Sequence, residues 1–222
     1  MNRLQKTIVL GASALSLALG TLVGPGLWAR VSTQWLGLDY TGHGNWVEPA
    51  VTVAEQAARA DLVVRARVFS IENRELREVL PYYAADGVTV DGHREHITPF
   101  SDVTFEVIET FKGKAEPYLT ALQTGGTLVD EKSGVETRFA LNDDPIFHKG
   151  SEHILFLVDI SGDSLHAAGR SLYRVVNPLG RYELAGGRLV KPVAADELSA
   201  PVAASLPATE EQLLAEIRRA LG

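Results

Sequence analysis

The string Gly162-Asp163-Ser164-Leu165 carries the first residues whose types could do chemistry. It spells GDSL, the nucleophile motif of many esterases, and it follows an apolar segment that could present the serine. Such a serine needs an imidazole base held by a carboxylate, with oxyanion donors nearby. The sole later histidine is His166, two residues after the serine, so no separate segment supplies the base. We therefore interpret the string as a polar turn between strands and predict no catalytic residue.

A second candidate is His93-Arg94-Glu95-His96, with Asp91 just before it. Imidazoles three residues apart, together with carboxylates, are ligand types for zinc or copper, and His148 or His153 could complete the shell. The glutamate lies inside the histidine pair, unlike the His-Glu-x-x-His order, and nothing places the cluster on a helix. We expect a solvated polar loop. A metal-binding protein or metal-dependent hydrolase that uses the two histidines stays an alternative hypothesis.

Carboxylates also cluster at Asp130, Glu131, Asp143 and Asp144, where oxygen ligands could bind calcium. The EF-hand spacing and its glycine are missing, so solvated turns are the favoured interpretation. No phosphate-cradling Gly-x-x-x-x-Gly-Lys string and no dinucleotide fingerprint occur. The chain has no cysteine, which excludes disulfides, thiolate metal sites and cysteine nucleophiles. We predict no cofactor and no bound metal.

Composition sets the broad class. Of 222 residues, 45% are hydrophobic and 22% are charged, which is ordinary for a globular chain with a real core. The net charge of −7 argues against broad attraction to nucleic acid or to anionic lipid. The sequence predicts one domain with a targeting segment, and no nucleic-acid partner.

The N-terminus has the pattern of an export segment. Arg3 and Lys6 precede an apolar run from Thr7 to Trp28, which predicts a signal peptide or membrane anchor over residues 1–30. If the segment is not cleaved, a helix over residues 8–29 is almost long enough to span the hydrocarbon layer of a membrane, which is about 30 Å thick. Whether or not the segment is cleaved, we expect the body of the protein to be extracytoplasmic, either secreted or anchored to the cell membrane. Residues 31–50 hold scattered glycines and aromatics, and we expect an irregular lead-in there.

The following residues predict a short helix and two strands. Thr52 and Glu55 have capping-box spacing, which predicts a helix over residues 53–59. Alternating apolar residues predict strands over residues 61–70 and 101–113, the second being the central hairpin-forming strand. Residues 72–99 mix acids, arginines and tyrosines. We expect a long surface loop or hairpin excursion there, and it is our first candidate for a partner surface.

The remaining elements are short. Strands are predicted over residues 118–123, 153–160, 171–176, 181–184 and 187–190, the second of them covered on both faces. Residues 129–144 form a polar excursion, a second candidate partner loop. Residues 192–208 are rich in Ala, Pro and Ser, which predicts a linker. Residues 209–222 have the apolar spacing, cap and end charges of an amphipathic helix that packs back on the body.

The predicted strands resemble an uncharacterised group of extracytoplasmic bacterial β-domains. The resemblance lies in residues 60–64, 105–113, 147–152, 154–157, 173–176 and 180–182. This layout is similar to an OB-like barrel of the netrin or tissue-inhibitor kind. It implies a mainly β fold, a small antiparallel barrel of five to six strands over residues 51–191. Metalloprotease inhibitors of that kind act through an N-terminal cysteine clamped by disulfides, which this chain lacks, so their activity does not carry over.

Three functional hypotheses follow. The leading one is a non-enzymatic, exported β-barrel module that binds a protein or cell-envelope partner through residues 72–99 and 129–144. The second is the metal-binding or metal-dependent alternative at His93 and His96. The third is a purely structural envelope protein. The first rests on clear strand signals and an export segment without a complete catalytic constellation.

Overall fold

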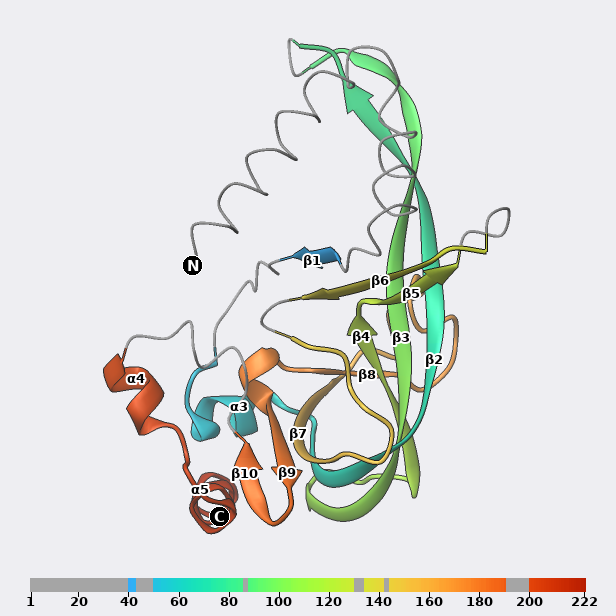
Figure 1. The fold of residues 1–222 in the computed structure, drawn as a ribbon. Helices are drawn as coiled ribbons and strands as arrows, with labels where there is room; N and C mark the ends of the chain where they lie inside the picture. The colour runs from blue at the N-terminus through green and yellow to red at the C-terminus, as the bar shows by residue number, and fades with distance from the viewer. Residues whose placement is uncertain (1–39, 43–49, 86–87, 130–133, 142–143, 191–199) are drawn as a thin grey trace, which may run out of the picture. The chain divides into compact units, whose positions relative to one another are not determined.

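The computed structural model describes residues 40–42, 50–85, 88–129, 134–141, 144–190 and 200–222 (Figure 1). The predicted signal or anchor over residues 1–30 and most of the lead-in over residues 31–50 lie outside the described residues. Within the described residues, no helix has the length and apolar character needed to cross a membrane. Two compact units divide the chain. One holds Met1–Tyr40 and Val129–Arg138, and the other holds Thr41–Leu128 and Phe139–Gly222.

The protein is mainly β, as predicted. Its larger sheet has seven strands in the order β10-β9-β7-β2-β3-β4-β8. The bounds are β2 (Leu62–Tyr83), β3 (Val90–Lys112), β4 (Tyr118–Thr124), β7 (Glu152–Asp159), β8 (Tyr173–Val175), β9 (Arg181–Ala185) and β10 (Arg188–Val190). A smaller sheet has the order β1-β6-β5, with β1 (Tyr40–Gly42), β5 (Gly126–Val129) and β6 (Glu136–Leu141).

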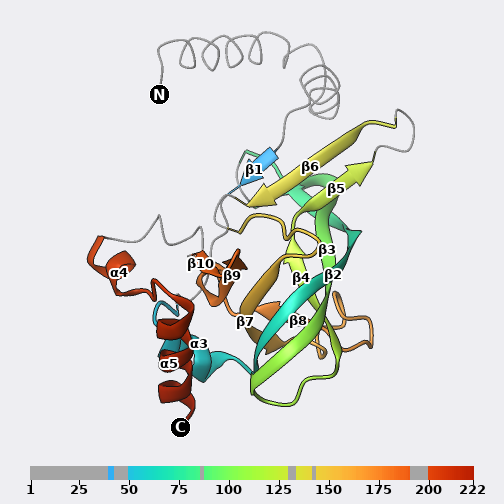
Figure 2. The same ribbon diagram turned by 60° about the horizontal axis from the view of Figure 1, so that its bottom comes forward.

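Five strands of the larger sheet close into a ring. β2 pairs with β3 and β7, β3 pairs with β4, and the short β8 pairs with both β4 and β7 (Figure 2). The expectation of an antiparallel sheet is wrong at one place, because β4 and β8 run parallel. A parallel pair needs a long crossover, and the chain between β4 and β8 supplies one. The sheet is therefore mixed.

The ring interior is filled by the alternating apolar residues that the sequence places on one face of each strand. The buried residues of β2 include Leu62, Val64, Ala66 and Val68, and Val103 and Phe105 of β3 belong to the same cluster. The whole buried set is Leu62, Val64, Ala66, Val68, Val103, Phe105, Leu119, Ala121, Phe147, Leu155 and Leu157. Hydrophobic burial of this continuous cluster stabilises the closed ring.

β7 is covered on both faces, as its unbroken apolar run predicts. Leu155 and Leu157 point into the ring, while Ile154 and Phe156 join a second cluster with two helices. The helices are α3 (Val53–Arg59) and α5 (Glu210–Leu221), which lie side by side (Figure 2). The predicted packing of the C-terminal helix on the body is therefore confirmed.

Both helices begin where the sequence predicts. The Thr52 side chain accepts a hydrogen bond from the Glu55 backbone N–H, and the Glu55 carboxylate accepts one from the Thr52 N–H, which completes the capping box. Thr209 caps α5 in the same way, by accepting from the Gln212 N–H. Glu210 at the start of α5 also binds Arg65 of β2 at 3.0 Å. This ion pair ties the terminal helix to the outer face of the ring.

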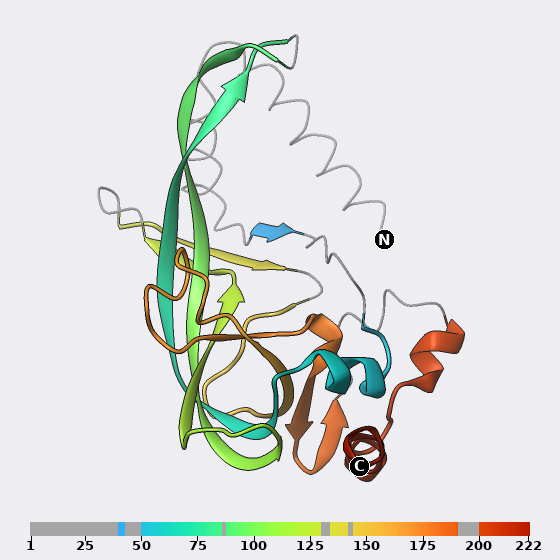
Figure 3. The same cartoon turned by 180° about the vertical axis from the view of Figure 1, so that it is seen from behind.

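Residues 72–99 form an extended hairpin, so of the two expected alternatives the loop is wrong and the hairpin excursion is confirmed. The β2–β3 register continues from Val63↔Lys112 to Tyr83↔Val90 (Figure 3). The sequence pattern concealed the strands because charged residues occupy the alternating positions. On one face Arg77 binds Glu75 at 2.7 Å and Glu95 at 3.4 Å. The first pair lies within β2 and the second joins β2 to β3, and such charged side chains take the place of apolar alternation here.

Two other expectations need correction. The predicted linker over residues 192–208 contains α4 (Ala200–Ser205), because its alanines favour helix despite Pro201 near its start. The polar excursion over residues 129–144 includes the end of β5 and all of β6. The connection between β8 and β9 contains a short 3₁₀ helix, Pro178–Gly180, capped by the Asn177 side chain.

Shortening a buried residue of α5 should destabilise the protein. Leu213 is fully buried against α3 and β7, so Leu213→Ala should lower the free energy of unfolding by about 2–5 kcal/mol. Leu221 lies two turns further on and is 37% exposed, so Leu221→Ala should change the free energy by less than about 0.5 kcal/mol. Urea unfolding followed by circular dichroism measures both. Equal effects of the two substitutions would contradict packing of α5 on the ring.

Candidate functional site

His93 and His96 lie on strand β3, so the expected loop at this position is wrong. His93 is exposed, and the His96 side chain lies outside the described residues. Within the described part of the chain, no group of three or more His, Cys, Asp or Glu side chains is placed to hold a metal ion. Metal binding at His93 and His96 therefore gains no support from the described side chains.

His153 cannot complete a shell with His93. On β2, the cross-strand neighbour of His153 is Ala66 and that of His93 is Pro81. These neighbours are fifteen residues apart, which is about 50 Å of strand at roughly 3.3 Å per residue. His148 is exposed in the connection that leads into β7. The four histidines thus do not form one site.

The four acids considered as calcium ligands, for which solvated turns are the favoured interpretation, fall in two groups. Asp130, Glu131 and Asp143 lie outside the described residues. Asp144 is buried, and its carboxylate accepts a hydrogen bond from Arg181 at 2.7 Å. The Arg181 guanidinium also lies 3.6 Å from the centre of the Phe147 ring. A buried carboxylate is stable only with such a partner, so the pair explains the burial of Asp144 without a metal.

His153 is buried on β7 beside this pair. Its Nε2 lies 2.7 Å from the Ser151 hydroxyl, which itself donates to the His148 carbonyl, so Nε2–H is the donor to Ser151. Nδ1 then carries a lone pair, and it has no hydrogen-bond partner among the described residues. Burial, helped by the positive charge of Arg181, lowers the pKa of His153 to about 3. The imidazole is therefore a neutral part of the core.

The string Gly162-Asp163-Ser164-Leu165 lies in a turn, as predicted. The Asp163 carboxylate accepts from His166 Nδ1 at 2.7 Å and from the backbone N–H groups of Leu165 and His166. The bond from the His166 side chain is the main reason that the pKa of Asp163 is lowered. Ser164 is exposed, and in the described residues it makes no hydrogen bond to His166. An acid and an imidazole are paired here without the serine.

Residues 161–172, here called the 161–172 loop, are bound to the base of the β2–β3 hairpin. Arg170 makes two hydrogen bonds to the buried Asp102 carboxylate, at 2.5 and 2.9 Å, and these bonds raise the pKa of Arg170. Arg74 donates to Asp102 and to the His166 carbonyl, both at 3.3 Å. The Phe100 and His166 rings meet edge to face at 5.2 Å. Asp102 therefore joins the loop to both strands of the hairpin.

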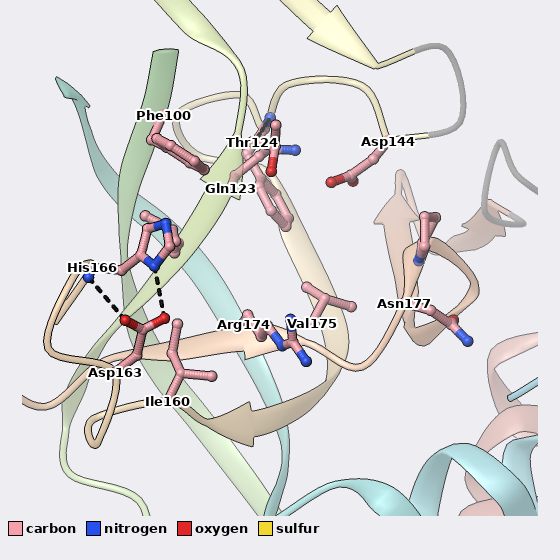
Figure 4. A pocket seen from close by; sticks show the side chains of 13 residues that line it. Phe100, Gln123, Thr124, Asp144, Ile160, Asp163, His166, Arg174, Val175 and Asn177 are labelled. Atoms are coloured by element: carbon pink, nitrogen blue, oxygen red, sulfur yellow. Dashed lines mark hydrogen bonds and ion pairs between the residues drawn. The ribbon is translucent and has the colours of Figure 1, made fainter. Parts of the chain in front are cut away.

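A cavity of about 220 Å³ opens between this loop and the end of β4 (Figure 4). Its apolar lining includes Phe100, Leu122 and Val175, and its polar lining includes Arg174 and the Asp163–His166 pair. In Figure 4, Phe100, His166 and Asp163 lie on one side of the opening, and Asp144 and Asn177 lie on the other. The cavity gathers residues from five separate segments of the chain.

Sequence reasoning missed most of this lining. Arg174 lies in a strand that was predicted, but no local pattern distinguishes its guanidinium from a solvated charge. Gln123 ends a predicted strand and Asn177 lies between two predicted strands, and neither spacing nor residue type indicates a shared cavity. The one usable signal was the Asp-x-x-His spacing of Asp163 and His166, which the structure brings together as a pair.

The buried His153 should make stability fall with acid. Its pKa is about 3 when folded and about 6.5 when unfolded, so the unfolded state binds the proton first. Stability is full above pH 6.5 and should fall by up to about 1.4 kcal/mol per pH unit between pH 6 and pH 4. His153→Leu should flatten the unfolding free energy in this window, whereas His148→Gln, at an exposed site, should keep the slope. An unchanged slope in the Leu variant would refute the assignment.

Removing the Arg170 guanidinium should loosen the 161–172 loop. In Arg170→Gln, Asp102 keeps Arg74 as a partner, so no buried charge is left unpaired. Loss of charge-assisted hydrogen bonds worth about 1 kcal/mol or more should speed amide exchange in the loop at least about fivefold. Hydrogen–deuterium exchange with mass spectrometry measures it. Arg188→Gln, at an exposed position on β10, should leave the exchange unchanged, and protection kept by Arg170→Gln would contradict the anchoring role.

The chain matches no protein-family model, and comparison with curated proteins finds no match either. The family resemblance inferred from the strand motifs therefore stays a prediction. What this chain does has to be argued from its own residues.

Proposed function

We propose that this chain is a non-enzymatic, exported OB-like module that binds a protein or cell-envelope partner through the tip of its β2–β3 hairpin. The part of the hairpin beyond the ring, residues 74–83 of β2 and 90–99 of β3, is here called the arm. One observation carries the proposal. The arm projects as a two-stranded ribbon (Figure 3), and the large side chains exposed at its tip are apolar or tyrosine.

The strand order supports an OB-like barrel as the finer description of the ring. Three consecutive antiparallel strands, β2, β3 and β4, are followed by β7, which pairs with β2, and by β8, which lies between β4 and β7. In OB folds, the connections between the first and second strands and between the fourth and fifth strands form the binding surface. The corresponding connections here are the arm and the 161–172 loop.

The tip of the arm supports a binding role by its composition. Val79 is 70% exposed and Tyr83 is 54% exposed. The other large exposed residues of the tip are Leu80, Tyr82, Val88 and Val90. Single exposed apolar residues are ordinary, but a group on a hairpin tip is typical of an interaction surface. Tyrosine suits such a surface because it buries a large ring and keeps a hydroxyl for hydrogen bonding.

The edges of the arm supply a second means of binding. Within the described residues, residues 74–83 pair only with β3, and residues 90–98 pair only with β2, whereas the Pro99 carbonyl accepts from the Gly125 N–H. Each strand therefore presents unpaired backbone N–H and C=O groups along its outer edge, where an extended segment of a partner could add as a strand. The charged face formed by Glu75, Arg77 and Glu95 keeps the arm soluble without such a partner.

Export is the part of the proposal that rests on the sequence alone. The basic start and apolar run within residues 1–30 predict export of the body across the cytoplasmic membrane, where a protein or envelope component would be the available partner. The net charge of −7 argues against a nucleic-acid ligand, even though OB folds often bind one. A protein partner therefore fits the arm best.

A matched pair of variants tests the arm. Val79→Ser with Tyr83→Ser removes an aliphatic and a tyrosine side chain from the tip, whereas Ile108→Ser with Tyr118→Ser removes similar side chains, 46% and 52% exposed, from the ring. The full-length proteins are immobilised and compared for capture of envelope proteins from the source cell, followed by quantitative mass spectrometry. The arm variant should lose a specific partner at least about tenfold, because exposed aromatic anchors dominate binding.

The control variant should keep that partner, and both variants should unfold at the temperature of the unmodified protein. If the ring variant loses the partner and the arm variant keeps it, the partner binds elsewhere. If no protein is captured in an arm-dependent way, the purely structural interpretation replaces the proposal.

A further inference from the structure

The cavity arises where two paired strands separate. β4 and β8 are joined over only two residue pairs, Ala121↔Tyr173 and Leu122↔Arg174. Beyond them β4 continues to Thr124, while β8 ends at Val175 and the chain turns into the 3₁₀ helix. The divergence leaves a space of about 220 Å³ that side chains of the two strands do not fill. The cavity is thus built by backbone geometry within the larger unit.

The amide side chains in the lining already have partners. Gln123 accepts from the Phe147 N–H and donates to the Pro145 carbonyl, both at 3.0 Å. Asn177 accepts from the Leu179 N–H and donates to the Ala50 carbonyl. These two residues hold the wall of the cavity in place and leave little hydrogen-bonding capacity for a ligand.

The carboxylates in the lining are also satisfied. Asp144 accepts from Arg181, and Asp163 accepts from one imidazole and two backbone N–H groups. A cation entering the cavity would have to displace these donors from at least one of the two acids. The geometry therefore disfavours a cationic ligand, although two acids line the space.

Arg174 differs from these groups. Its guanidinium makes no hydrogen bond or ion pair within the described residues, and it lies at the cavity in Figure 4. His166 uses only Nδ1 toward Asp163, so its Nε2 stays available, and the Thr124 hydroxyl likewise has no hydrogen bond among the described residues. Of these three groups, the guanidinium forms the strongest hydrogen bonds, because it is charged. Its planar arrangement of N–H donors matches the two oxygens of a carboxylate.

The size and the apolar part of the lining limit the ligand further. Phe100, Leu122, Phe147, Ile160 and Val175 supply hydrocarbon surface. An apolar cavity of about 150 Å³ holds benzene, so about 220 Å³ has room for a ring and one carboxylate. Larger drug-sized ligands need roughly 300 Å³ or more.

We propose that this cavity binds a small organic carboxylate, with its apolar body against Phe100, Leu122 and Val175 and its carboxylate on the Arg174 guanidinium. The site does not depend on the arm, because none of the exposed apolar residues of the tip lines it. It can therefore be tested separately from the proposed function.

The test compares benzoate with benzamide, which has the same shape without the charge. Each is titrated into full-length protein, and binding is followed by amide chemical shifts in NMR spectra. Benzoate should cause saturable shifts in residues 122–124 and 174–178, and benzamide should bind at least about tenfold more weakly. Equal affinities would overturn the proposal, as would shifts confined to other parts of the chain.

Substitutions of Arg174 test whether its guanidinium binds the carboxylate of the ligand. Arg174→Gln should weaken benzoate at least about tenfold, Arg174→Lys should retain part of the affinity, and Arg188→Gln should retain all of it. Arg174 is exposed, so each variant should fold, which its melting temperature checks. Full affinity in Arg174→Gln would overturn the assignment.

An acetylated tetrapeptide that ends in phenylalanine distinguishes the source of the carboxylate. Tighter binding than benzoate supports a chain terminus, and weaker binding supports a free acid.

Discussion

The fold depends on β8, a strand of three residues that hydrogen-bonds to two neighbours. It runs parallel to β4 and antiparallel to β7, and without it the ring would be an open sheet with two exposed edges. Tyr173 and Val175 turn inward and pack on the core, which compensates for the small number of backbone bonds. Arg174, between them in sequence, lies on the opposite face of the strand, and the side chains of Arg174 and Val175 both line the cavity. Closure and cavity are consequences of the same three residues.

β7 is the second constraint, because it separates two hydrophobic clusters and belongs to both. Buried polar groups gather at its start, where His153 lies near Arg181 and Asp144 compensates the arginine. A charge in this position is tolerated only with such a partner, and the neutral imidazole adds no second charge. The arrangement gives β7 one register and one orientation, so the sheet, α3 and α5 assemble around it in one way.

Much of this architecture could be predicted from local patterns. The apolar alternation of residues 62–68, the unbroken apolar run of β7 and the capping box at Thr52 each identify one element, because they are short-range signals. The parallel contact between β4 and β8 could not be predicted, since it joins residues about fifty positions apart. The arm was concealed because ion pairs replace its apolar alternation. The cavity was invisible because Phe100, Gln123, Asp163 and Arg174 meet only in space.

Phe69 has a consequence for how this protein tolerates insertions and deletions. Val68 pairs with Phe105 and Ser70 pairs with Thr104, so Phe69 is an extra residue that bulges from β2. From this bulge to the next register shift, between Tyr82 and Tyr83, the face on which each β2 side chain lies depends on Phe69. Deletion of Phe69 would turn Arg74 to the opposite side of the ribbon, away from Asp102. A change of length in the turn near residue 85 would leave each of these side chains on its present face. Homologous sequences should therefore carry insertions and deletions at the turn and none at the bulge.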